Sequence, residues 1–152
     1  MTTHLSGSHT AVDTFARWYT AHEAGDVTGL TAVLAEDVTV HSLFRPEPAR
    51  GRAAAAAHFR GTTTTFTDLT MALLSAAAAD GNVVLAEVLF TGAFTGVLSW
   101  SGREHHGRGQ RLAVPGAVVV HTRADAVTSV RTLFDRDDWL RQIGVLDADS
   151  PR

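Results

Sequence analysis

Residues 82–95 read NVVLAEVLFTGAFT, and this stretch decides the fold. Glu87 is the only charged residue in it, so we expect a strand whose two faces are both covered. Asp80-Gly81, directly before it, is a tight-turn signal, and Ala124-Asp125 is a second short break further on. We therefore predict four long strands joined by antiparallel hairpins, over residues 68–78, 82–95, 108–123 and 126–135.

Helical periodicity dominates the chain before residue 65. Val12, Phe15, Tyr19 and His22 recur every three or four residues, which predicts an amphipathic helix over 11–24. The same reasoning predicts the remaining elements: a short helix ending near Glu36-Asp37, a strand over 38–42, a loop over 45–51, a helix from Ala53 to Arg60, and a last helix over 136–144 capped by Gly144.

This order of elements, α-α-β-α-β-β-β-β-α, predicts an α+β domain with helices on one face of a curved antiparallel sheet. The chain of 152 residues, 45% of them hydrophobic, suits one globular domain. We expect that domain to span residues 11–145, with disordered polar tails at 1–10 and 146–152.

Composition excludes several kinds of chemistry. The sequence has no Cys and no Lys, so it offers no thiol nucleophile, no thiolate metal ligand and no Schiff base. A net charge of −3 argues against nucleic-acid binding, and no stretch is apolar enough for a signal peptide or a membrane span. We expect a cytoplasmic protein whose partners are an apolar small-molecule substrate and a second copy of itself, without a membrane, a nucleic acid or a cofactor.

Several strings of residues resemble one family in combination. They are Trp18-Tyr19 followed by Ala24-Gly25-Asp26, then residues 35–41, then Gly51 opening a helix, residues 91–96, and Asp135 followed by residues 140–144. Together they resemble the nuclear transport factor 2-like superfamily, in particular its SnoaL-like polyketide cyclases. The resemblance covers residues 11–145 and implies a cone-shaped domain whose curved sheet wraps around the N-terminal helices and encloses a pocket.

The resemblance also places known roles on positions of this chain. Ketosteroid isomerases have a carboxylate base where this chain has Ser42, and hydrogen-bond donors where it has Ala117 and Trp18. Aldol-type SnoaL-like cyclases have an aspartate where Thr132 stands, and histidines where Val118 and Phe94 stand, by a gap-free match. All these positions are replaced, which argues against proton abstraction by a carboxylate.

Five residues are candidates for catalysis. His41 ends the first strand, and its alternative role is a surface histidine, since its neighbour Ser42 points to the other face. His58 lies on the third helix, where it is either a pocket residue or simply packed. Thr132 should face inward by alternation and can form hydrogen bonds. Glu87 is either a buried general acid or an outward residue paired with an arginine, and Asp135 has the same ambiguity.

Substrate contacts are expected mainly from aromatic side chains. Trp18, Tyr19 and His22 follow one another around the first helix and form one predicted wall. The glycine-flanked loop 97–110, which carries Trp100, is predicted as a mobile lip, and adjacent histidines in it do not have the spacing of a metal site. The other predicted contacts are Ser42, Phe59, Phe90, Ala117 and Phe134.

These residues favour a cofactor-independent cyclase-like or isomerase-like enzyme that folds a polyketide or similar metabolite in an apolar cavity. The first alternative is a hydrolase such as an epoxide-opening enzyme, which requires a carboxylate pair or a carboxylate–His pair to activate water. Glu87 and Asp135 would then have to converge. The second is a binding domain without catalysis, whose mark is a cavity without polar side chains. The apolar outer face of the sheet predicts a homodimer, unless flanking loops cover that face.

Overall fold

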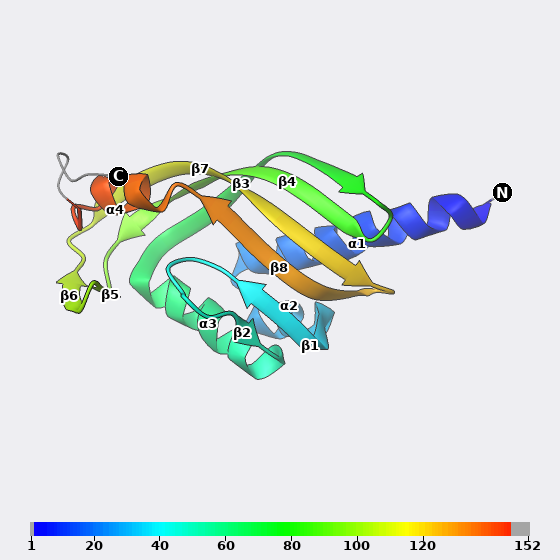
Figure 1. Cartoon of the computed structure of the whole chain (residues 1–152), viewed down its shortest axis with the longest axis horizontal. Helices are drawn as coiled ribbons and strands as arrows, with labels where there is room; N and C mark the ends of the chain where they lie inside the picture. Colours follow the sequence, from blue (N-terminus) through cyan, green and yellow to red (C-terminus); the bar gives the residue numbers. More distant parts are fainter. Residues whose placement is uncertain (1, 147–152) are drawn as a thin grey trace.

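The computed structural model describes residues 2–146, with side chains from residue 11 onward. Its centre is a curved six-stranded sheet with three helices on one face and a fourth helix at one end (Figure 1). The order of strands across this sheet is β2-β1-β8-β7-β4-β3. The strands are β1 (Leu34–His41), β2 (Ala49–Arg50), β3 (Phe66–Ala79), β4 (Val83–Phe94), β7 (Gln110–Arg123) and β8 (Ala126–Phe134).

The helices and a small hairpin complete the fold. The helices are α1 (Thr2–Ala24), α2 (Val27–Val33), α3 (Arg52–Thr65) and α4 (Arg136–Gln142). The hairpin is a separate two-stranded sheet of β5 (Val97–Trp100) and β6 (Arg103–His106). The α+β fold class is therefore confirmed, and in the described part of the chain no helix is both long and apolar enough to cross a membrane.

The three predicted hairpin pairings are confirmed. β3 with β4, β4 with β7, and β7 with β8 all pair antiparallel. Asp80 and Gly81 both have positive φ angles, 57° and 68°, as a tight turn requires. The sheet is nevertheless mixed, because β1 runs parallel to β8. The predicted antiparallel sheet is therefore wrong for this one pair, because the long connection between β1 and β8 allows either direction.

Several element boundaries differ from the predictions. Helix α1 begins at Thr2 and not near residue 11, and its first turns extend past the sheet (Figure 1). Helix α2 ends at Val33, before the predicted end near Glu36-Asp37, and β1 begins at Leu34. The apolar side chain of Leu34 fits the hydrophobic pattern of a helix as well as that of a strand. The glycine-flanked segment expected to be a loop forms the β5–β6 hairpin. The predicted tail from residue 147 onward lies outside the described residues.

The end of α4 follows the sequence prediction. Gly144 has a φ of 79°, and the N–H of Val145 donates to the carbonyl of Leu140 at 2.8 Å. A left-handed residue after the last turn allows this bond to form, and glycine adopts that conformation without steric cost. The predicted C-cap is therefore confirmed.

Alternation along the central strands separates two faces of the sheet. Ala86, Val118 and Thr132 are paired across β4, β7 and β8 and face the helices. The next row, Glu87, Ala117 and Leu133, faces away from them. Within this chain only the inner face of β4 is fully covered, since Leu85 on the outer face is 48% exposed. The outer face of β4 would be covered, as the sequence predicts, only if another molecule packed against it.

Side chains of α1 occupy the free edge of β3. The Tyr19 hydroxyl donates to the carbonyl of Met71 at 2.8 Å and accepts from the N–H of Leu73 at 3.2 Å. The Glu23 carboxylate accepts from the N–H of Met71, with both oxygens at 3.1 Å. Burial raises the pKa of Tyr19, with the charge of Glu23 as the next cause, so the hydroxyl remains a donor. An edge strand that would otherwise expose unpaired backbone groups is thereby fixed to the helix.

We predict that Tyr19→Phe lowers the free energy of unfolding by about 1–2 kcal/mol, because it leaves backbone groups of Met71 and Leu73 without these partners. Urea denaturation followed by circular dichroism measures the change. Thr20→Ala, at the exposed neighbouring position of α1, is the control and should stay within about 0.5 kcal/mol of wild type. Equal stabilities of Tyr19→Phe and wild type would show that the hydroxyl does not anchor the strand.

Candidate functional site

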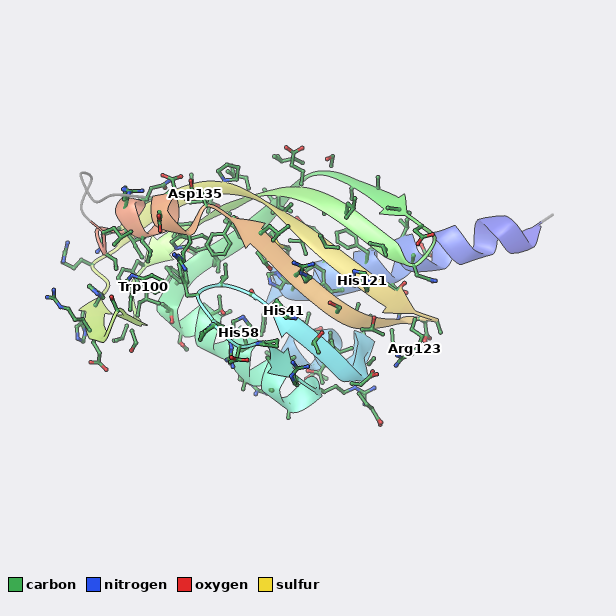
Figure 2. All side chains as sticks on the ribbon, viewed as in Figure 1. His41, His58, Trp100, His121, Arg123 and Asp135 are labelled. Atoms are coloured by element: carbon green, nitrogen blue, oxygen red, sulfur yellow. The ribbon has the colours of Figure 1, made fainter. Side chains whose placement is uncertain are left out.

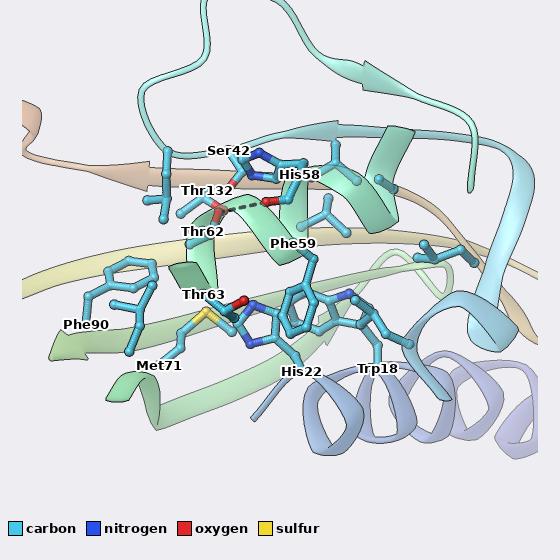
Figure 3. Close-up of a pocket in the computed structure, with 17 residues that line it drawn as sticks. Trp18, His22, Ser42, His58, Phe59, Thr62, Thr63, Met71, Phe90 and Thr132 are labelled. Atoms are coloured by element: carbon cyan, nitrogen blue, oxygen red, sulfur yellow. Dashed lines mark hydrogen bonds between the residues drawn. The ribbon is translucent and has the colours of Figure 1, made fainter. Parts of the chain in front are cut away.

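A largely enclosed cavity of about 70 Å³ lies between the inner face of the sheet and helices α1, α2 and α3 (Figure 3). At about 10–15 Å³ for each water centre, it has room for roughly five water molecules. Most of its lining is apolar: Trp18, Leu30, Leu34, Val40, Leu43, Ala55, Phe59, Leu69, Met71, Phe90 and Val130. We call this space the inner cavity.

Polar side chains line the inner cavity from two sides. Ser42, His58, Thr62 and Thr132 gather on one wall, and His22 and Thr63 lie on the other (Figure 3). None of the described residues that line the cavity is an Asp or a Glu. The cavity therefore offers hydroxyl groups and imidazoles as hydrogen-bonding groups, without a carboxylate base.

The pairing of β1 with β8 explains why Ser42 and Thr132 are neighbours. His41 and Arg131 are partners in this parallel pair; Ser42 directly follows the end of β1, and Thr132 is the next residue of β8. Because side chains alternate along a strand, both hydroxyl-bearing residues face the same side, which is opposite to that of His41 and Arg131. Two hydroxyl groups therefore stand together on the cavity wall.

His58 is a neutral hydrogen-bonding group. It comes from α3, and burial lowers the pKa of its imidazole to about 4, with the positive charge of Arg45 and then His22 as further causes. At neutral pH the ring therefore carries one N–H donor and one nitrogen acceptor. The hydroxyl of Thr62, one helical turn later, donates to the backbone carbonyl of His58 at 3.0 Å.

His22 is held between two aromatic rings on the opposite wall. Its ring centroid lies 5.2 Å from that of Trp18 and 5.1 Å from that of Phe59. Its Nδ1 lies 3.2 Å from a carboxylate oxygen of Glu23. Since an ionised carboxylate only accepts hydrogen bonds, a bond between these two atoms requires the proton on Nδ1.

A wider and more open hollow of about 510 Å³ adjoins the inner cavity. Both are lined by Ser42, Leu43 and Thr132, so these residues stand at their junction. The other residues around the hollow come from the end of β1 and the loop after it, from the β5–β6 hairpin, from the end of β8 and from α4. They are His41, Phe44, Arg45, Pro46, Ser99, Trp100, Ser101, Phe134 and Arg136. We call this space the outer hollow.

The structure brings many of the predicted residues together. His58, Thr132, Trp18, His22, Ser42, Phe59 and Phe90 line the inner cavity. Trp100 and Phe134 line the outer hollow. The catalytic and substrate-binding roles of these side chains remain predictions. The sequence reasoning missed Thr62 and Thr63, although Thr62 stands four residues after His58, the spacing that places two side chains on one helical face.

Other predicted residues lie elsewhere. His41 is exposed and lines only the outer hollow, because the alternation of β1 turns Ser42 inward in its place. Tyr19 does not line the cavity, since its hydroxyl is bonded to β3. Ala117 lies on the outer face with its partner Glu87 and lines neither space, so the predicted substrate contact there is wrong.

The two predicted carboxylates do not meet in the cavity. Glu87 is exposed on the outer face, where its carboxylate accepts a long hydrogen bond from Ser75 at 3.5 Å. Asp135 lies where β8 leads into α4 (Figure 2) and caps that helix by accepting from the N–H of Asp138 at 3.0 Å. Neither residue lines the inner cavity, so Glu87 and Asp135 do not converge there as the hydrolase alternative expected of them.

Metal ligation has no support within the described residues. No group of three or more His, Cys, Asp or Glu side chains among them could hold a metal ion. His105 and His106 are consecutive residues of β6, so their side chains point to opposite sides.

Comparison with known proteins identifies the family. The model of the SnoaL-like domain matches residues 15–130, and the chain therefore belongs to the SnoaL-like family. The comparison with curated proteins found no significant match.

Solved structures share the fold. A putative polyketide cyclase from Xanthomonas campestris is 24% identical, with a TM-score of 0.79 over 91% of this chain and 99% of that one. Another from a Silicibacter species is 25% identical, with a TM-score of 0.74 over 88% and 95%. A Catenulispora acidiphila protein with a ketosteroid isomerase-like fold, in complex with trimethylamine, is 20% identical, with a TM-score of 0.72 over 91% and 97%. The predicted cone-shaped fold is thus confirmed.

The low pKa of His58 predicts how stability depends on pH. The unfolded chain binds a proton on this imidazole near pH 6.5, whereas the folded protein does so only near pH 4. Stability associated with the neutral ring is therefore present above pH 6.5 and is lost as the pH falls toward about 4. His58→Asn should lose less stability over this range than wild type does, as measured by urea denaturation at a series of pH values.

His41→Asn is the matched control, because it removes an exposed histidine outside the inner cavity. It should keep the pH dependence of wild type. If His58→Asn loses stability as steeply as wild type between pH 6.5 and about 4, the imidazole is not held neutral by the fold.

Proposed function

We propose that this protein is a cofactor-independent enzyme, cyclase-like or isomerase-like, that shapes a polyketide or a similar metabolite for ring closure. The observation that carries the proposal is the cavity wall formed by Ser42, His58 and Thr132 in a lining that contains no carboxylate. Membership of the SnoaL-like family, and the fold shared with putative polyketide cyclases, support the same class of activity.

The apolar lining supplies the larger part of the proposed mechanism. A flexible chain with several carbonyl groups loses much conformational freedom when it reacts with itself. A cavity whose shape holds its reacting atoms close together removes that cost before the reaction begins. Phe59, Phe90 and Trp18 give this cavity a rigid aromatic surface.

The polar wall supplies the smaller part. As a carbon–carbon bond forms next to a carbonyl, negative charge develops on the carbonyl oxygen. The hydroxyl groups of Ser42 and Thr132 and the N–H of neutral His58 can donate hydrogen bonds to that oxygen, and such donors are strongest in a site that excludes water. A neutral imidazole is a weak base, so this arrangement suits a substrate whose acidic protons need little help to leave.

We predict that the protein accelerates cyclisation of a tetraketide N-acetylcysteamine thioester without added cofactor, as measured by liquid chromatography with mass spectrometry. Thr132→Val keeps the shape of the side chain but removes its hydroxyl, and should lower the turnover rate about a hundredfold. Ser129→Ala, on the opposite face of the same strand, should keep the wild-type rate.

The same assay separates catalysis from binding. If the thioester binds but cyclises no faster than in buffer, the protein is a binding domain and the proposed activity is wrong. An equal rate for Thr132→Val and wild type would remove Thr132 from the mechanism.

We further propose that a second copy of the chain covers the outer face of the sheet. Two leucines are exposed on the outer face, Leu133 of β8 at 49% and Leu85 of β4 at 48%. Leu85 and Leu133 lie among smaller apolar residues, Ala117 and Val119, to which they are paired on β7. Burying such a face against a copy of itself removes this apolar surface from water.

Leu85→Glu should convert the dimer into a monomer, because it places a charge in the centre of the proposed interface. Analytical ultracentrifugation measures the shift, with at least a tenfold weaker dimer expected. Val97→Glu is the matched control, since Val97 is 45% exposed but lies on the β5–β6 hairpin. A monomeric wild type at micromolar concentration would exclude this interface.

A further inference from the structure

The outer hollow has the opposite electrostatic character to the chain as a whole. The protein carries a net charge of −3. Arg45, from the loop after β1, and Arg136, from the first turn of α4, nevertheless both line this one hollow. Among the described residues around it there is no Asp or Glu. Two guanidinium groups at one opening, without a lining carboxylate, favour an anion.

Arg136 is held in place by an aromatic ring. The carbon atom of its guanidinium lies 4.9 Å from the ring centroid of Trp100, which itself lies 6.2 Å from the ring centroid of Phe44. The Nε of Arg136 lies 3.7 Å from a carboxylate oxygen of Asp137. Stacking on Trp100 restricts the guanidinium plane, and a restricted plane of N–H donors binds carboxylate or phosphate with little further loss of freedom.

Arg45 acts on both spaces. Its Nε donates a long hydrogen bond to the carbonyl of Glu47 at 3.4 Å, within the loop. Its positive charge is also one cause, after burial, of the low pKa of His58, which lies in the inner cavity. Arg45 lines the outer hollow together with Ser42 and Thr132, so its positive charge stands near the junction of the two spaces.

We propose that the outer hollow binds the anionic end of the substrate, a carboxylate or a phosphate, between Arg45 and Arg136. The apolar part of the same molecule then enters the inner cavity past Ser42 and Thr132. This inference rests on the proposed function and names the class of molecule that it would use: an amphipathic anion.

A guanidinium group can bind a carboxylate and a phosphate in the same way. Carboxylate and phosphate groups both present pairs of oxygens that accept two parallel N–H donors from one guanidinium. A neutral amide or ester has a single carbonyl oxygen and no charge, so it gains neither the second bond nor the Coulomb attraction. Discrimination between an acid and its amide is therefore the signature of this site.

The test is a binding experiment with three probes of nearly equal apolar size: 2-naphthylacetate, 2-naphthylacetamide and 2-naphthyl phosphate. Isothermal titration calorimetry of the whole protein should show at least one anion binding tenfold or more tightly than the amide. The preference should weaken as salt is added, since salt screens exposed charges. Tighter binding of the carboxylate probe would indicate a substrate with a free carboxylate, and tighter binding of the phosphate probe a substrate with a phosphate group.

Two variants and one control locate the site. Arg136→Gln and Arg45→Gln should each weaken binding of the favoured anion about five- to tenfold and change binding of the amide less than twofold. Arg60→Gln removes an exposed arginine on α3 that lines neither space, and should leave all affinities unchanged. Because all three arginines are exposed, each variant is expected to fold.

Three results would overturn the inference: equal affinities for the anions and the amide, no binding of any probe, or equal losses in Arg136→Gln, Arg45→Gln and Arg60→Gln. Its failure is distinguishable from failure of the proposed function. Cyclisation of the thioester without discrimination between acid and amide would leave the activity and remove the anion site. Discrimination without cyclisation would leave the anion site in a binding protein.

Discussion

The register between β4, β7 and β8 is the constraint on which the rest of the structure depends. Ala86, Val118 and Thr132 are paired along one row that faces the helices. A slip of one residue would turn that row outward and bring Arg131 or Leu133 against the helices. Hydrophobic burial opposes the slip, because Val84, Val88, Val114, Val118 and Val120 are almost completely buried in the present register. The position of the one hydroxyl that β8 gives to the cavity therefore follows from the packing of valines on its neighbours.

Packing also closes one end of the molecule and shapes the outer hollow. Trp139 of α4 is completely buried, and its ring lies 5.1–5.5 Å from those of Phe44, Phe66, Phe90 and Phe134. Phe44 and Phe134 then form part of the wall of the outer hollow. Gly116 is needed beside them, because a Cβ atom there would lie 2.6 Å from the carbonyl oxygen of Leu133 and 2.8 Å from the ring of Phe90. The hollow therefore has a rigid aromatic floor.

The inner cavity and the outer hollow differ in charge, and this difference would orient a bound molecule. The inner cavity holds neutral hydrogen-bonding groups, whereas arginines line the outer hollow. The inner cavity favours apolar groups and the outer hollow favours negative charge. An amphipathic molecule would therefore bind with its apolar end in the inner cavity. A carboxylate in the inner cavity would be poorly solvated there, which agrees with the outward positions of Glu87 and Asp135. The inner cavity without carboxylates and the outer hollow with its two arginines therefore form one continuous site.

The sequence by itself determined the order of elements, the three hairpins and the cap at Gly144, because these depend on periodicity and turn chemistry within short segments. It also determined that Thr132 shares a face with Val130 and Phe134, since alternation along one strand is local. Only the tertiary structure decided which face is the inner one. His41 and Glu87 point outward and Ser42 inward because β1 runs parallel to β8 and β4 packs between β3 and β7, and these partners are distant in the chain. The neutral state of His58 has the same origin, since burial and the charge of Arg45 reach it through space and leave no trace in the residues beside it.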